Sequence, residues 1–182
     1  MRITVVGSGH AALSVATVFS LENEVKILRD GSIYQNVLLH APEYGVTDLE
    51  SLITDEPAKA LDGAELVVIS LIVPYDTELN MYDLHNLDMY MNQAMRYAPG
   101  AAIVLRSDVP VGYTARIRNR YPELDIAFVP DFAREGRSLQ DAFEPTRLII
   151  GGGSEKLTEL MSVLKHTGTS CIREIFLKEI RI

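Results

Sequence analysis

The stretch RITVVGSGHAALSV, residues 2–15, decides the fold of this chain. Its first five residues are mostly β-branched and apolar, which predicts a short buried strand. From His10 onward the sequence contains good helix formers with apolar residues at helical spacing, which predicts a helix over 10–21. A strand that passes through a glycine-containing turn directly into a helix is typical of the opening unit of an α/β fold.

The turn carries Gly7, Gly9 and Ala12 in the pattern G-x-G-x-x-A. In a dinucleotide-binding loop, the first glycine permits a tight turn and the second lets the backbone approach a pyrophosphate. The small third residue lets helix and strand pack closely. The helix N-terminus would offer free N–H groups and a positive dipole end to the phosphates. His10 and Ala11 lie inside this loop, where His10 could cap the helix, touch a phosphate or merely fill a partly exposed position. The context favours a dinucleotide-binding loop over a tight turn that binds nothing.

The rest of the chain continues to alternate strands with helices. Strands are expected at 24–28, 64–71, 101–105, 125–129 and 147–151, and helices at 82–97, 113–120 and 154–165. This alternation predicts one α/β domain over residues 1–182, with a Rossmann-like, doubly wound, mainly parallel sheet and helices on both faces. Residues 30–60 show only weak periodicity. The tail at 171–180 alternates well enough to form a last strand, which could pair with the edge of another chain.

The composition narrows the classes of function. The 182 residues carry a net charge of −8 with no basic block, so nucleic acid is not expected as a partner. Because the chain lacks an apolar run of about 18 residues and a signal peptide, we expect a cytoplasmic protein without a membrane span. A single cysteine, Cys171, excludes an internal disulfide and a Cys-cluster metal site. His40, His85 and His166 show no metal-ligand spacing, and no metal is expected.

The end of the second expected strand is where an acidic side chain would bind the adenosine ribose of NAD. Arg29 stands about twenty residues after Gly9, with Asp30 beside it. Arg29 suits the 2′-phosphate of NADP, whereas Asp30 could serve NAD if the strand end shifts by one residue. A third interpretation is that Arg29 is a solvated residue beside a lost adenosine pocket. The residues alone leave the three interpretations open.

Two longer motifs resemble those of a known family. LRSDVPVGYT, residues 105–114, resembles K-S-T-V-P-V-G-[FY]-T. FVPDFAREGRSLQDAFEPTRLIIGG, residues 128–152, resembles P-E-F-L-R-E-G-x-A-x-x-D…P-x-R-[IV]-[IV]-x-G. With the opening loop and the segments SLENEVKIL and AELVVIS, they resemble, in order, the N-terminal NAD-binding domain of the UDP-glucose/GDP-mannose dehydrogenase family. The resemblance covers roughly residues 1–153.

The resemblance implies a reaction and roles for particular residues. Enzymes of this family oxidise the C6 alcohol of a nucleotide sugar, such as UDP-glucose, to a carboxylate with two NAD molecules in sequence, and a cysteine nucleophile holds the aldehyde. Glu135 stands at the position to which acid/base or water-handling work is assigned. Asp131 replaces the motif's earlier glutamate. Ser107 matches the K-S-T-V-P-V-G motif, and Asp108 replaces the threonine that lies near the nicotinamide.

These acids have competing interpretations. Asp108 and Asp131 would lie near strand ends, where ligands bind in such folds, and would push each other's pKa values apart. A fixed negative charge there could favour the nicotinamide cation over neutral NADH, or could bind water or a cation. Both acids could equally be solvated loop residues. Glu135 and Arg134 could simply pair with each other or with nearby loops.

Other positions depart from the family pattern. The family's ribose-binding aspartate aligns with Arg29, and the resemblance ends before the central dimerising helix and the sugar-binding domain with its nucleophilic cysteine. Cys171 does not match the nucleophile motif and is expected to be a buried structural thiol. We therefore expect an NAD-binding or NADP-binding part of a 6-dehydrogenase, inactive alone, that is completed by a second chain or that self-associates. The alternative is a non-catalytic pseudo-enzyme that acts as a binding or regulatory module.

Overall fold

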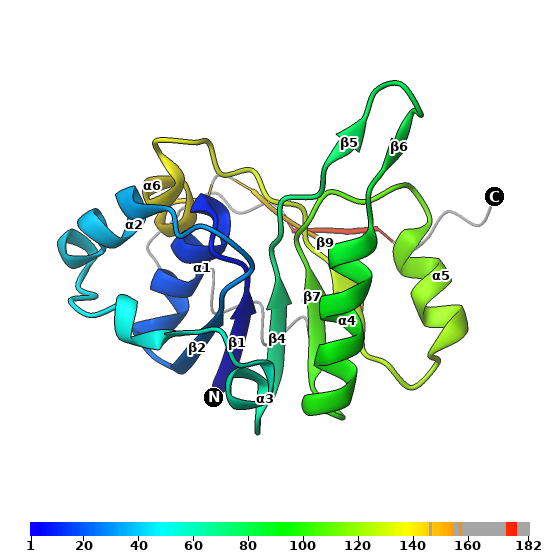
Figure 1. The fold of residues 1–182 in the computed structure, drawn as a ribbon, viewed down its shortest axis with the longest axis horizontal. Helices are drawn as coiled ribbons and strands as arrows, with labels where there is room; N and C mark the ends of the chain where they lie inside the picture. Colours follow the sequence, from blue (N-terminus) through cyan, green and yellow to red (C-terminus); the bar gives the residue numbers. More distant parts are fainter. Residues whose placement is uncertain (146, 155–156, 158–173, 178–182) are drawn as a thin grey trace.

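The computed structural model describes residues 1–145, 147–154, 157 and 174–177, and a largely parallel sheet forms its centre (Figure 1). Within these residues the strands of the sheet are β1 (Arg2–Val6), β2 (Glu24–Leu28), β3 (Ile53–Thr54), β4 (Leu66–Ile69), β7 (Ala102–Leu105), β8 (Ile126–Phe128), β9 (Leu148–Gly152) and β10 (Glu174–Leu177). Their spatial order is β10-β9-β8-β7-β4-β1-β2-β3. All neighbouring pairs are parallel except β8 and β9. The expected Rossmann-like, mainly parallel sheet is confirmed.

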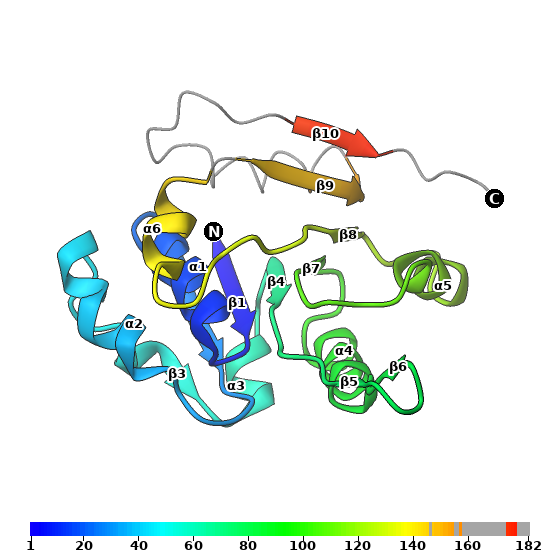
Figure 2. The same cartoon turned by 90° about the horizontal axis from the view of Figure 1, so that it is seen from above.

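Helices cover both faces of this sheet. They are α1 (His10–Ser20), α2 (Gln35–His40), α3 (Pro57–Leu61), α4 (His85–Tyr97), α5 (Tyr113–Arg120) and α6 (Ser138–Phe143). Alternate strand residues face opposite sides, so Ile3 and Val5 pack in a core with α1, α2 and α6. Val6 belongs to a second core with α3, α4 and α5. Figure 2 shows α3, α4 and α5 along one side of the sheet, with α1 and α6 on the other.

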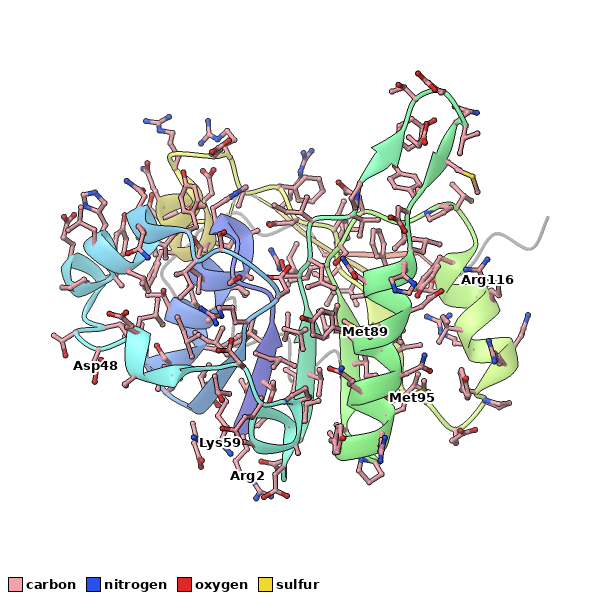
Figure 3. The ribbon with its side chains drawn as sticks, in the orientation of Figure 1. Arg2, Asp48, Lys59, Met89, Met95 and Arg116 are labelled. Atoms are coloured by element: carbon pink, nitrogen blue, oxygen red, sulfur yellow. The ribbon has the colours of Figure 1, made fainter. Side chains whose placement is uncertain are left out.

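The site-forming end of the molecule follows from the strand order. The chain moves from β1 outward to β2 and β3, and then crosses to β4, β7 and β8 on the other side of β1. Ligands of such folds bind beyond the carboxyl ends of the strands at this reversal. Those ends point toward the β5 (Tyr75–Asp76) and β6 (Met81–Tyr82) hairpin in Figure 1. Arg2 and Lys59 mark the opposite end in Figure 3.

The weakly periodic segment 30–60 folds into several short elements. Besides α2, β3 and α3, it contains the 3-10 turns Ala41–Tyr44 and Glu50–Leu52. None of these elements is long enough to generate a readable period, which explains why the sequence did not reveal them.

The C-terminal expectations are tested only in part. The tail strand predicted at 171–180 contains β10, which pairs in parallel with β9 of the same chain. Most of the helix predicted at 154–165, and Cys171, lie outside the described residues. In the described part of the chain, no helix combines the length and apolar character needed to cross a membrane.

Candidate dinucleotide-binding site

The glycine loop begins at a position where only glycine fits. Gly7 has φ = 134°, a conformation that side-chain-bearing residues rarely adopt. A Cβ there would collide with the carbonyl oxygen of Ser70 and with the side chain of Ala12. The N–H of Gly7 donates to the carbonyl of Leu28 at 2.9 Å. Gly7 therefore lets β1, β2 and β4 approach one another at the start of the loop.

Helix α1 begins at the second glycine with its N-terminus open. Gly9 is the N-cap, no side chain caps the helix, and its first turn contains no acid. A Cβ on Gly9 would touch only Ile72, at 3.7 Å. Ala12 is fully buried, which allows α1 to lie close to the sheet. The uncapped N–H groups and this open approach fit a pyrophosphate.

His10 and Ala11 occupy the first turn of α1 and line a cavity of about 220 Å³. The His10 ring makes an edge contact with Tyr34, with 5.6 Å between ring centroids. His10 is half-buried and does not cap the helix, so it occupies the partly exposed position that the sequence allowed.

On the β2 side of the loop, the polar side chains form hydrogen bonds and an ion pair with one another. The backbone N–H and the hydroxyl of Ser8 both donate to Oδ1 of Asp30 at 2.7 Å. The Arg29 guanidinium pairs with both oxygens of Asp55, at 2.5 and 2.6 Å. Tyr90 lies beside this group and donates to the backbone carbonyl of Arg29. Its pKa is raised by burial first and then by the negative charges of Asp30 and Asp55.

The opposite wall of the cavity comes from the segments that follow β4, β7 and β8. Arg106 pairs with Asp131 at 2.6 Å, and their side chains are only 11% and 17% exposed. Oδ1 of Asp131 also accepts the N–H of Ala133 at 3.1 Å. Ser107 is buried and its hydroxyl accepts the N–H of Leu71 at 2.8 Å, which ties the ends of β7 and β4 together. Asp108 lines the same cavity but is exposed.

The loop after β8 places the remaining predicted residues elsewhere. Glu135 is exposed and is not among the residues that line this cavity, whereas Asp108 and Asp131 both line it. Arg134 pairs with Asp141 at 2.6 Å. The hydrogen bonds from Arg134 are the main cause that holds the pKa of Asp141 below its usual value.

A larger neighbouring cavity of about 330 Å³ shares Arg106 and Asp131 as a wall. At its edge, the Arg147 guanidinium lies 3.8 Å from the centre of the Phe132 ring. We assign the cofactor to the smaller cavity, because that cavity contains the start of α1. No group of three or more His, Cys, Asp or Glu that could hold a metal is found in the described ranges.

The comparison with protein families decides what this site belongs to. Residues 1–167 match the model of the UDP-glucose/GDP-mannose dehydrogenase family, NAD binding domain. The chain belongs to this family. The chain is therefore an NAD-binding domain of the kind that takes a nicotinamide dinucleotide cofactor.

Individual relatives support the family assignment. A UDP-glucose 6-dehydrogenase of Campylobacter jejuni is 31% identical over 192 residues, which is 99% of this chain and 46% of the relative. One from Streptococcus pneumoniae is 28% identical over 163 residues, covering 83% of this chain and 41% of the relative. The chain thus spans under half the length of these dehydrogenases.

Solved structures share the fold. A GDP-mannose dehydrogenase from Pseudomonas aeruginosa, solved as a ternary complex, matches with a TM-score of 0.76 and 17% identity, over 98% of this chain and 47% of that one. A UDP-glucose dehydrogenase from Pyrobaculum islandicum matches with a TM-score of 0.72 and 20% identity, over 97% of this chain and 46% of that one.

Four residues that contact the predicted site residues were not identified from the sequence. Ser8, Asp55, Tyr90 and Arg106 contact the predicted residues from the loop, the end of β3, α4 and the end of β7. Ser8 and Arg106 lie directly beside predicted residues, so their positions in the motifs were a usable signal. Asp55 and Tyr90 had no local signal, because they meet Arg29 only in the folded chain.

Proposed function

We propose that this chain binds NAD across the phosphate loop, as the cofactor-binding part of a nucleotide-sugar 6-dehydrogenase of the UDP-glucose type. The observation that carries the proposal is the uncapped start of α1, which opens into the cavity lined by Arg106, Ser107 and Asp108. A pyrophosphate at this helix end would direct the adenosine toward β2 and the nicotinamide toward β4 and β7.

The contacts at the end of β2 favour NAD over NADP. Arg29 is the side chain that would bind a 2′-phosphate, but both oxygens of Asp55 already engage its guanidinium. Asp30 uses Oδ1 for Ser8 and has no described donor to Oδ2, which suits a ribose hydroxyl. Two carboxylates at this end would also repel a further phosphate.

The proposed reaction removes a hydride and a proton from a sugar alcohol. Bound NAD would supply the hydride acceptor. Asp131 is held by Arg106 and by the N–H of Ala133, so it suits a fixed charge that orients other groups. The Asp108 carboxylate has no hydrogen-bond or ion-pair partner among the described residues, so we propose it as the group that accepts the proton directly or through water. Glu135 stays proposed as an acid/base group, acting from the exposed loop that would face a bound sugar.

We also propose that protein beyond these residues supplies the sugar-binding wall, either in a second chain or through self-association. Hydride transfer needs the alcohol carbon, a base and the nicotinamide held together in one pocket. The described residues that line the cavity beside Asp108 come from the phosphate loop and from the segments after β4, β7 and β8, which together form the proposed cofactor site.

A second candidate is a non-catalytic binding or regulatory module. The observation that favours it is that Glu135 is exposed and does not line the cavity with Asp108 and Asp131. Such a module would still bind NAD, but it would not oxidise UDP-glucose when combined with a separately produced sugar-binding part of a relative. NADH formation in that mixture, followed at its absorbance band, would favour the dehydrogenase.

Calorimetric titration of NAD and NADP tests the cofactor assignment. We expect NAD to bind at least about tenfold more tightly than NADP, because the Arg29 charge is already neutralised. Asp55→Asn should narrow this difference by releasing Arg29, and Arg29→Asp should remove any remaining binding of NADP. Absence of heat with both nucleotides in the folded wild-type chain would overturn the proposal.

A further inference from the structure

The charges around the cofactor cavity do not cancel. Its ionisable lining residues are His10, Arg106, Asp108 and Asp131. Arg106 pairs with Asp131 at 2.6 Å. Within the described ranges, no residue makes a hydrogen bond or an ion pair with the Asp108 carboxylate. Among the described residues, Asp108 is therefore the acid of the cavity whose charge has no paired cation.

Asp108 lies on the side of the cavity that the nicotinamide would occupy. It follows β7 by three residues, whereas the adenosine-binding candidates Arg29 and Asp30 follow β2. β1 and β4 separate these two strands in the sheet, and the start of α1 lies between the two positions. A dinucleotide whose pyrophosphate sits on α1 would bring its nicotinamide, and not its adenine, close to Asp108.

The two redox forms of the cofactor differ in charge only at that ring. The oxidised nicotinamide carries a formal positive charge, and the reduced ring is neutral, while the phosphates keep the same charge in both forms. An unpaired carboxylate near the ring attracts the oxidised form alone. We propose that Asp108 makes this chain selective for the oxidised dinucleotide over the reduced one.

This inference rests on the proposed function and deepens it. An enzyme that oxidises an alcohol must take up the oxidised cofactor and release the reduced one in every cycle. Asp108 would promote both events, because reduction of the ring cancels the attraction that held it. Asp108 thus affects the binding and release of the cofactor, and this role is separate from the proton acceptance proposed for it above.

The size of the effect is limited by solvent. Asp108 is exposed, so water and salt screen its charge more strongly than that of a buried acid. We expect Asp108 to change the ratio of the two dissociation constants by about three- to tenfold at low salt, tenfold being about 1.4 kcal/mol. The ratio of the Kd of NADH to the Kd of NAD⁺ should fall as the ionic strength rises.

Calorimetric titration of NAD⁺ and NADH into four forms of the chain tests the proposal. In Asp108→Asn, which keeps the shape and removes the charge, the Kd of NAD⁺ should rise about three- to tenfold while that of NADH changes less than about twofold. Asp108→Glu keeps the charge and should preserve the selectivity. Glu22→Gln removes one charge just beyond the C-terminal end of α1, far from the loop, and should change neither Kd.

The outcomes separate this inference from the proposed function. If both dinucleotides bind but Asp108→Asn weakens them equally, the carboxylate contacts a part common to both forms and the selectivity proposal is wrong. An unchanged ratio in Asp108→Asn would overturn it as well. If the wild-type chain binds neither NAD⁺ nor NADH, the proposed function fails and this inference fails with it. Thermal unfolding of each variant checks that lost binding does not reflect lost folding.

Discussion

At the carboxyl end of β2, Arg29 and Asp30 are both engaged by other side chains, whereas at the carboxyl end of β7 Asp108 has no partner among the described residues. On the β2 side, Asp30 holds Ser8 of the phosphate loop, and Arg29 holds Asp55 just after β3. The β7 side buries one ion pair, Arg106–Asp131, and leaves one acid exposed beside it. A charge that already has a partner contributes mainly to structure, and an unpaired charge in a cavity is available to a ligand.

The phosphate loop between the two sides gives the largest expected effect. Gly7→Ala should lower the free energy of unfolding by about 3 kcal/mol, because the added Cβ meets the Ser70 carbonyl and φ is positive. Gly9→Ala should change it by less than about 0.5 kcal/mol, since that Cβ has room. It should nevertheless weaken NAD binding by narrowing the approach to α1. Urea unfolding and calorimetry measure the two effects, and equal destabilisation by both substitutions would contradict the distinction.

The ion pairs Arg106–Asp131 and Arg29–Asp55 allow the contribution of charge pairing to stability to be compared between the two sides. Arg106→Met should cost about 2 kcal/mol, because it leaves the largely buried Asp131 with only the N–H of Ala133. Arg29→Met is the matched control and should cost less than about 1 kcal/mol, since side chains in that pair are 41% and 63% exposed. Urea unfolding at pH 7 measures both values. A larger loss of unfolding free energy in Arg29→Met than in Arg106→Met would show that the β2 side, and not the β7 side, depends on its charges for stability.

The smallest expected effect is a change in the electrostatic potential on the β2 side, which the pKa of Tyr90 reports. Burial and then the charges of Asp30 and Asp55 raise the pKa of Tyr90, because its deprotonation would add a negative charge next to two others. Asp55→Asn removes one of these charges, so the pKa of Tyr90 should fall toward its ordinary value. Titration by NMR follows this change, with Glu22→Gln as a control. An unchanged pKa of Tyr90 in Asp55→Asn would mean that Asp55 does not contribute, and that burial and Asp30 raise the pKa without it.

Much of the fold was readable from the sequence because its core elements carry strong local patterns. The strands that became β1, β2, β4, β7, β8 and β9, and the helices α1, α4 and α5, have apolar periods that residue order alone displays. The short pieces between 30 and 60 lack such a period, so α2, β3 and α3 could not be placed in advance. The antiparallel direction of β9 also depends on pairing between distant strands.

The site was predictable where its residues lie in one motif. Gly7 and Gly9 indicate the loop, and the match of residues 105–114 to the family singled out Ser107 and Asp108, which line the cavity at the start of α1. The sequence left three interpretations for Arg29 and Asp30, because their neighbours determine what each can bind. Asp55 directly follows β3 and binds Arg29, and Ser8 in the loop binds Asp30. Both contacts form only after the strands have paired.

The sequence by itself therefore determined the parallel α/β sheet, the phosphate loop and the family, since these depend on local spacing and on residues next to one another. The tertiary structure alone decided which charges are cancelled. Arg29 meets Asp55 across 26 positions of sequence and Arg106 meets Asp131 across 25, while Asp108 meets no described partner. Charge pairing is set by distance in space, and residue order does not state that distance until the sheet has formed.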